Sequence, residues 1–274
     1  MNRKHIKIHF LMICFHMGSS LISQAQQPPL LNSGENKIIC RLVQDESQQA
    51  EVALQIRREE AQDDSRYILT KNSYGNYERY TDIQWRSRSQ LTERNGKLYV
   101  EESTTIFETR IGELIKKIEK RYDYATRRSE FIEYDNNGRV IRSRSFVIQG
   151  PICDDVTLNQ FLRAWILSQE NFDPLQPQRT KIPNIFLMTN EGKVYNVVVI
   201  YKGTENIMVH HRSIKAQKWQ LMADLGPLTQ AAASFVPPTY VWFEDNPAFQ
   251  WIKYQGMESG YQSAYIEASR VFER

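Results

Sequence analysis

Hydrophobic and polar residues alternate along most of the chain, a pattern typical of strands that are buried on one face and solvated on the other. Turn sequences such as Asn95-Gly96 and Asp135–Gly138 interrupt the alternation, because Asn and Gly tolerate the positive φ of tight hairpins. The pattern therefore predicts antiparallel strands. In the first half of the chain they are expected at 38–43, 52–56, 66–70, 77–89, 97–107, 115–124, 129–134 and 140–148.

One segment, at about 155–170, has the three- and four-residue apolar spacing of a helix. Asp155 or Thr157 can cap its first turn, Arg163 is expected outside the apolar stripe, and Asn171 is expected to end it. A second set of strands follows, at 184–189, 194–201, 207–213 and 217–221 and through the aromatic C-terminal region. We therefore predict an all-β, mainly antiparallel fold, a large half-open β-barrel or curved sheet with one covering α-helix. Two small domains are the alternative.

The N-terminus has the features of a secretory signal peptide. Three basic residues precede a short apolar run at 10–22, and Ser23-Gln24-Ala25 offers small residues at the positions that a signal peptidase reads. The run is too short to favour the alternative of a retained membrane anchor. We expect a signal peptide over 1–25, a flexible leader over 26–36 and one β-rich domain over 37–274. The expected location is the periplasm, or outside the cell.

The balance of charge argues against a nucleic-acid partner. The chain has 35 basic and 32 acidic residues, and the expected signal peptide removes three basic residues and no acidic one. The mature chain would then have a formal charge of zero, whereas phosphate binding needs a basic surplus. Arg-Ser-Arg-Ser occurs at 86–89 and again at 142–145, where alternate arginines are expected on a solvated outer face. No later apolar run predicts a transmembrane segment after cleavage.

Few residues have the identity and spacing of a catalytic or metal site. In the mature chain, His210 and His211 would point to opposite faces of a strand, and no Cys-x-x-Cys or His-x-x-x-His spacing is present. No Gly-x-Ser-x-Gly turn or glycine-rich phosphate loop is present either. We therefore predict no metal, no cofactor and no enzymatic activity. An enzyme with an unrecognised set of residues is the alternative. Cys40 and Cys153 form either a disulfide or two buried thiols.

Aromatic residues are concentrated at 239–256, on both sides of an expected turn at Asp245-Asn246-Pro247. Alternation places Tyr240 and Trp242 on one face of the first strand and Phe243 on the other. Such rings either close a core through cross-strand pairs or line a pocket for an apolar ligand. The candidate ligand-binding residues are Tyr240, Trp242, Phe249 and Trp251, with Phe161 and Trp165 from the helix.

Three parts of the chain resemble, in order, a family of exported bacterial proteins of unknown function. They are Asp154–Leu158 with Phe161-Leu162-Arg163, then Gly203–Ile207, and finally Tyr240–Phe243 followed by Lys253-Tyr254. This family is grouped with the outer-membrane lipoprotein carrier and receptor (Lol-type) fold. The resemblance covers about residues 50–270 and implies an unclosed antiparallel barrel with helical cover in the periplasm. The named carriers shelter acyl chains inside the half-barrel, and the family provides no catalytic residue to transfer.

These observations predict an exported, non-enzymatic protein that binds a lipid or another apolar small molecule inside a half-barrel. The alternative is a structural or protein-interaction module of the cell envelope whose aromatic residues fill the core. The two hypotheses differ in what they expect inside the sheet. An apolar void of roughly 300 Å³ or more favours the first, because small-molecule sites have volumes of this order.

Overall fold

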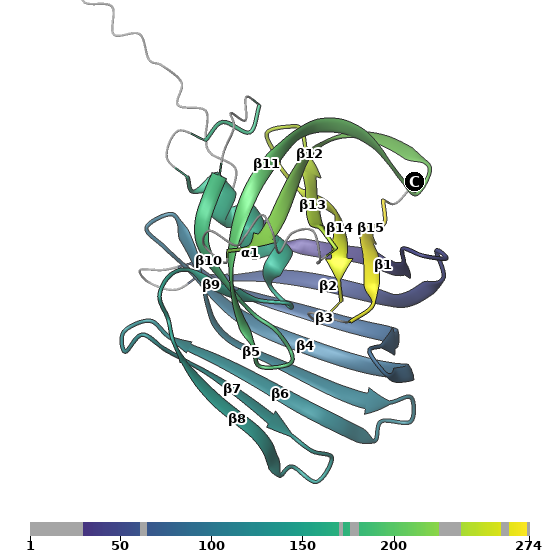
Figure 1. Ribbon diagram of the computed structural model, residues 1–274, viewed down its shortest axis with the longest axis vertical. Coiled ribbons are helices and arrows are strands. Elements are labelled where there is room, and N and C mark those ends of the chain that lie inside the picture. Colours follow the sequence, from purple (N-terminus) through teal and green to yellow (C-terminus); the bar gives the residue numbers. More distant parts are fainter. Residues whose placement is uncertain are drawn as a thin grey trace, which may run out of the picture.

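The computed structural model describes residues 30–60, 65–169, 172–175, 181–224, 237–258 and 263–272. The expected signal peptide lies outside these ranges. Within them, fifteen strands form one continuous curved sheet, and one helix lies between the ninth and tenth strands (Figure 1). The predicted all-β, mainly antiparallel architecture with one covering helix is therefore confirmed. No helix in the described part of the chain is long and apolar enough to cross a bilayer.

Most strands lie in the sheet beside the strands that precede and follow them in the sequence. The strand order is β8-β7-β6-β5-β4-β3-β2-β1-β15-β14-β13-β12-β11-β10-β9, and every pair is antiparallel except the parallel pair β9–β10. The first set comprises β1 (Gly34–Leu42), β2 (Gln48–Glu60), β3 (Ser65–Tyr77), β4 (Tyr80–Arg94), β5 (Lys97–Thr109), β6 (Leu114–Asp123), β7 (Arg128–Tyr134), β8 (Val140–Val147) and β9 (Ile152–Asp154). The helix α1 (Leu158–Leu167) precedes β10 (Lys181–Met188), β11 (Val194–Val209), β12 (Arg212–Ala223), β13 (Thr239–Glu244), β14 (Trp251–Met257) and β15 (Tyr265–Arg270).

Turn chemistry accounts for several strand boundaries. Asn95 and Gly96 both have positive φ, 51° and 69°, as the Asn-Gly hairpin signal predicts. The strand expected at 77–89 is instead interrupted by a turn at Glu78, whose φ is 52°. Tyr77 is the last residue of β3, and β4 begins at Tyr80. At the N-terminus, Leu31 is only 3% exposed and β1 begins at Gly34. The packed chain therefore begins before the end of the expected leader.

The sequence analysis expects His210 and His211 on a strand, and this expectation is wrong. They form the two-residue turn between β11 and β12, with φ of 46° and 66°, and Val209 pairs with Arg212 across it. Histidine is among the residues that occupy this left-handed region more readily than most. Residues 207–213, expected as one strand, thus form the tip of a hairpin. The two histidine rings are therefore not held on opposite faces of a strand.

The helix covers the inner face of the sheet and packs against β5, β9 and β14. The apolar side of the helix is fully buried, and its residues Phe161, Leu162 and Ile166 belong to one hydrophobic core with residues from both strand sets. The core includes Phe107 from β5 and Phe243 from β13, and each such buried ring contributes about 1.5–3 kcal/mol. The helix thereby joins the two strand sets into one folding unit.

Arg163 is a correction to the predicted helix surface. It is only 5% exposed, and its guanidinium donates hydrogen bonds to the carbonyl oxygens of Leu30, Ala248 and Phe249 at 2.5, 2.6 and 2.9 Å. A planar guanidinium has five donors, so it can satisfy several backbone carbonyls at once. The helix ends at its C-cap Ser168, before the expected terminator Asn171, which lies outside the described residues.

Two arginines of the second Arg-Ser-Arg-Ser segment connect the sheet to the β10–β11 turn. Arg142 donates to the carbonyl of Glu191 at 2.9 Å, and Arg144 donates to the carbonyl of Gly192 at 2.8 Å. Gly192 has φ of 66° and lies so close to the ring of Phe131 that an added Cβ would come within 2.6 Å of it. The turn therefore packs onto β7 and β8, and these arginines hold it there rather than only facing solvent.

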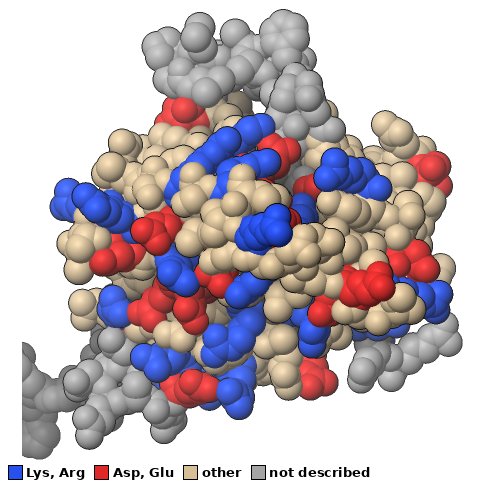
Figure 2. Space-filling view, turned by 90° about the horizontal axis from the view of Figure 1, so that it is seen from below, with Lys and Arg blue, Asp and Glu red and all other residues tan. Residues whose placement is uncertain are grey.

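Basic and acidic side chains are interspersed on the surface seen in Figure 2. The first Arg-Ser-Arg-Ser segment shows the local pattern. Arg86 and Arg88 face outward and contact Glu108 and Glu102 at 3.0 and 3.4 Å, while the serines between them face inward. The exterior is thus a mixed-charge surface in which pairs of opposite charge lie side by side.

Candidate functional site: an apolar cavity with a lysine in its wall

The inner face of the curved sheet encloses a cavity of about 630 Å³. This volume is within the range of small-molecule sites. Its wall is mainly apolar and comes from β1 to β5, from the start of α1 and from β10 to β15. The apolar residues that line it include Ile38, Val52, Tyr77, Trp85, Leu158, Leu187, Val197, Leu221, Trp251, Tyr254, Ile266 and Ala268.

The six side chains predicted to form one ligand wall do not come together. Trp251 lines the cavity. Phe161 and Phe249 are fully buried in the main core, and Phe161 stacks on the half-buried Trp165 with 5.9 Å between ring centroids. The cavity wall does not include Trp165, Tyr240 or Trp242.

Tyr240 and Trp242 belong to a separate small cluster with Val209, Ala216 and Ile252. Trp242 also donates a hydrogen bond of 2.8 Å from Nε1 to Glu205. The predicted division of faces on this strand holds, because Phe243 lies in the main core instead. What the sequence could not reveal is which of the two faces is turned toward the cavity.

A row of polar side chains crosses the apolar inner face. Lys71 on β3 is directly opposite Ser87 on β4, and Ser87 is directly opposite Thr105 on β5. Such cross-strand neighbours have Cβ atoms about 4.5–5.5 Å apart. The hydroxyls of Ser87 and Thr105 are 3.0 Å apart and hydrogen-bonded, and all three residues line the cavity. Three strands therefore place a lysine and two hydroxyl side chains in one row on the cavity wall.

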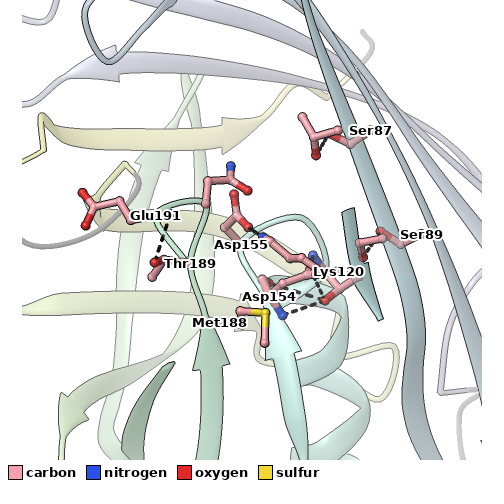
Figure 3. Close-up of polar contacts among 12 residues, drawn as sticks. Ser87, Ser89, Lys120, Asp154, Asp155, Met188, Thr189 and Glu191 are labelled. Carbon is pink, nitrogen blue, oxygen red and sulfur yellow. Dashed lines mark hydrogen bonds and ion pairs between the residues drawn. The ribbon is translucent and has the colours of Figure 1, made fainter. Parts of the chain in front are cut away.

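A second polar row lies next to the first, and it ends at the start of α1 (Figure 3). Ser103 donates to Ser89 at 2.7 Å, and Ser103 is directly opposite Lys120 on β6. Lys120 is only 1% exposed and forms an ion pair with Asp155. This lysine therefore has its counter-ion within the protein, as a buried charge requires.

The carboxylate of Asp154 organises the same corner. It accepts hydrogen bonds from the backbone N–H and the hydroxyl of Thr157 at 2.9 and 2.7 Å, and from the hydroxyl of Tyr122 at 3.2 Å. Thr157 is the N-cap of α1 but makes no side-chain capping bond, because its hydroxyl is used in this turn. The acidic pair that precedes the helix thus fixes where the helix begins and supports the cavity wall at Asp155.

Lys71 differs from Lys120 because no described carboxylate forms an ion pair with it. It is half-buried in the cavity wall, and burial lowers the pKa of its ammonium group. The acids that act on it electrostatically are Asp155 and Asp154, and Lys120 opposes them. A charge held in an apolar wall without a bonded partner is unfavourable unless something else, such as a ligand, compensates it.

Two further ionisable groups lie in the cavity wall. Lys193 has its own partner, because its ammonium group is 2.6 Å from a carboxylate oxygen of Glu191. Burial raises the pKa of the Glu258 carboxyl to about 7, although the backbone N–H of Glu78 donates to it at 3.0 Å. In a large fraction of the molecules the Glu258 carboxyl is therefore protonated and uncharged near pH 7.

Cys40 and Cys153 are both free thiols. Burial raises the pKa of Cys40, which lines the cavity, to about 12. Burial and the neighbouring Asp154 raise the pKa of Cys153 as well. Since only the thiolate is strongly nucleophilic, neither residue has the environment of a reactive cysteine at neutral pH.

No group of three or more His, Cys, Asp or Glu side chains in the described ranges could hold a metal ion. Within the part of the chain that the structure describes, Ser269 Oγ lies 3.2 Å from His210 Nε2. Neither residue lines the cavity, and the nearby Glu267 is paired with Lys253 at 2.6 Å. This contact lacks both the orienting acid and the adjoining pocket of a catalytic triad.

No protein-family model matches the chain, and no curated protein matches it significantly. Among solved structures, it is similar to one described as the crystal structure of a beta-barrel-like protein of domain of unknown function DUF1849 from Brucella abortus. The sequences are 7% identical, the similarity covers 87% of this chain and 96% of the other, and the TM-score is 0.44. A likeness at this level carries no argument about function.

Proposed function

We propose that this is an exported, non-catalytic binding protein that holds a lipid or another apolar small molecule inside its curved sheet. The observation that carries the proposal is the mainly apolar cavity of about 630 Å³. A void of this size in contact with apolar side chains is a favourable place to bury a hydrocarbon chain, at roughly 0.8 kcal/mol for each methylene removed from water.

The alternative, an envelope protein whose aromatic residues fill the core, is less well supported. It requires a solid interior, whereas aromatic packing occurs beside the cavity without filling it. Trp219 and Phe249, for example, pack edge to face at 6.4 Å in the core. Nucleophilic catalysis by the cavity-lining thiol of Cys40 is disfavoured, because burial raises its pKa to about 12. The expected export to the periplasm is part of the proposal and rests on the N-terminal sequence.

Ligand content tests this function directly. The mature protein would be purified without detergent and extracted with organic solvent, and the extract would be examined by mass spectrometry. A co-purifying lipid, or quenching of tryptophan fluorescence by an added alkyl ligand, is expected. Absence of both would count against the proposal.

A cavity-filling variant provides the matched control. Ala268→Phe places a ring in the cavity wall on β15 and should reduce ligand binding at least about tenfold by occupying the space. Ala53→Phe makes the same change on an exposed position of β2, outside the cavity, and should leave binding unchanged. Equal binding by the two variants would mean that the ligand lies elsewhere.

A further inference from the structure

The cavity is not uniformly apolar, and its polar groups are not randomly placed. Lys71, Ser87 and Thr105 are cross-strand neighbours in one row over three strands, and the hydroxyls of Ser87 and Thr105 are hydrogen-bonded to each other. The remaining wall is predominantly hydrocarbon and aromatic. A site with this division matches a molecule that has a small polar end and a long apolar body.

The sign of the charge follows from which cavity groups already have partners. Lys193 is paired with Glu191, and Asp155 is paired with Lys120. Glu258 is drawn toward its neutral form by burial and accepts a backbone N–H. Lys71 is the cavity cation that no described carboxylate pairs with, so the polar row has a positive charge available to a ligand.

We infer that the cavity binds an amphiphile with an anionic head, such as a long-chain carboxylate, whose head contacts Lys71, Ser87 and Thr105 while its chain lies along the apolar wall. This inference rests on the proposed function and adds the chemical class of the ligand. The ammonium group, and the one hydroxyl whose proton is not used in the Ser87–Thr105 bond, are donors suited to carboxylate or phosphate oxygens. Both contacts are stronger beside an apolar wall than in bulk water, because the local dielectric constant is lower.

The lowered pKa of Lys71 supports this assignment. Burial disfavours the charged ammonium group in the empty cavity. An anion bound beside the ammonium group would stabilise its charged form and raise the pKa again. A neutral head of the same size would gain nothing from this effect. The site should therefore discriminate between heads of equal bulk and different charge.

Calorimetric titration with ligands that share one chain tests the inference. The probes are decanoate, monodecyl phosphate, decanol and decyltrimethylammonium, added below their micelle-forming concentrations to delipidated protein at pH 6.5, where the Glu258 carboxyl is mostly neutral. One or both anions are expected to bind at least about tenfold more tightly than decanol, since hydrogen bonds to charged groups exceed those to neutral ones by this order. The cationic ligand is expected to bind most weakly. Comparison of the two anions shows whether a carboxylate or a phosphate head is preferred.

Two variants assign the effect to Lys71. Lys71→Met should weaken anion binding about tenfold or more and leave decanol binding nearly unchanged. Lys202→Met, the loss of an exposed lysine on β11, should change neither. Lys71→Arg keeps the charge and should retain much of the preference for anions, which also guards against a folding defect in Lys71→Met.

The outcomes separate the two proposals. If decanol binds as tightly as the anions, or if Lys71→Met leaves the preference for anions intact, the headgroup assignment is wrong and the proposed apolar binding function survives. If none of the ligands binds to the delipidated protein, the proposed function fails and the headgroup assignment fails with it.

Discussion

The side-chain amide of Asn190 donates a hydrogen bond of 2.8 Å to the phenol oxygen of Tyr77, and the two residues are 113 positions apart. Both line the cavity, Asn190 from the β10–β11 turn and Tyr77 from the end of β3. The same turn receives hydrogen bonds from Arg142 and Arg144 of β8. The turn therefore connects the second strand set to the first across the inner side of the sheet, and the cavity depends on that connection.

Tyr77→Phe tests this connection. The change retains the ring, which packs against Trp85 and Phe107 at 5.3 and 5.1 Å, but leaves the buried amide of Asn190 without its acceptor. The free energy of unfolding is expected to fall by about 1–3 kcal/mol, measured by urea denaturation.

Tyr74→Phe on the same strand is the matched control. Its side chain is 43% exposed and its hydroxyl bonds to Asp82 in solvent, so a change within about 0.5 kcal/mol is expected. Equal effects of the two substitutions would show that the Asn190–Tyr77 bond has no special part in stability.

The fold was more accessible from the sequence than the site because strand alternation and turn residues are local signals. Asn95-Gly96 encodes its hairpin directly, whereas His210-His211 encodes one through a less frequent use of the left-handed region. The helix at α1 follows from the same local patterns, whereas the union of both strand sets in one sheet depends on the distant pairing of β1 with β15. The side of a strand that faces a cavity is decided by distant partners, which is why Trp251 lines the cavity while Trp242 does not.

Arg163 and Lys71 illustrate the same limit for polar residues. The acceptors of Arg163 are backbone carbonyls up to 133 positions away, which no side-chain pattern reveals. For Lys71 one signal existed, because Tyr67 and Leu69 alternate with outward residues and place Lys71 and Ser73 on the inner face in the same register. Polar residues at inward positions of otherwise apolar strands are the pattern to look for.

Arg163→Met should be one of the more destabilising single changes in α1. Methionine fills part of the volume but leaves the carbonyls of Leu30, Ala248 and Phe249 without a donor, at about 1–3 kcal/mol for each acceptor that water cannot reach. A loss of about 3 kcal/mol or more is expected in urea denaturation. Arg57→Met, at a side chain that is 68% exposed, should change stability by less than about 0.5 kcal/mol. A loss at Arg163 no larger than that would contradict the buried geometry.

The two free thiols should resist alkylation in the folded protein. Burial raises the pKa of Cys40 to about 12 and also raises that of Cys153, so both are protonated at pH 8, and Cys153 is in addition fully buried. Mass spectrometry after iodoacetamide treatment should find little modification at pH 8 without urea and complete modification in urea. Reducing agent should leave the melting temperature unchanged, since no disulfide joins them. A drop in melting temperature on reduction would show that they pair in solution.

Glu258 should make stability depend on pH between about 4.5 and 7. Burial raises the pKa of its carboxyl to about 7 in the folded state from the ordinary 4.5, so in this interval the folded protein binds more protons than the unfolded chain. Its contribution is therefore most favourable below pH 4.5 and is lost as the pH rises to 7. Glu258→Gln should stabilise the protein more at pH 8 than at pH 5. Glu130→Gln, at an exposed position on β7, should show no such difference in urea denaturation at the two pH values.

Lys71→Met should raise stability while impairing ligand binding. Burial lowers the pKa of Lys71, so at pH 7 its charged form opposes folding, and a methionine of similar length removes that opposition within an apolar wall. The free energy of unfolding in urea is expected to rise without ligand, whereas Lys202→Met should leave it unchanged. A residue retained for packing would lose stability on this replacement. Opposite effects on stability and on anion binding are the pattern of a residue kept for its ligand, because functional sites commonly sacrifice stability for chemistry.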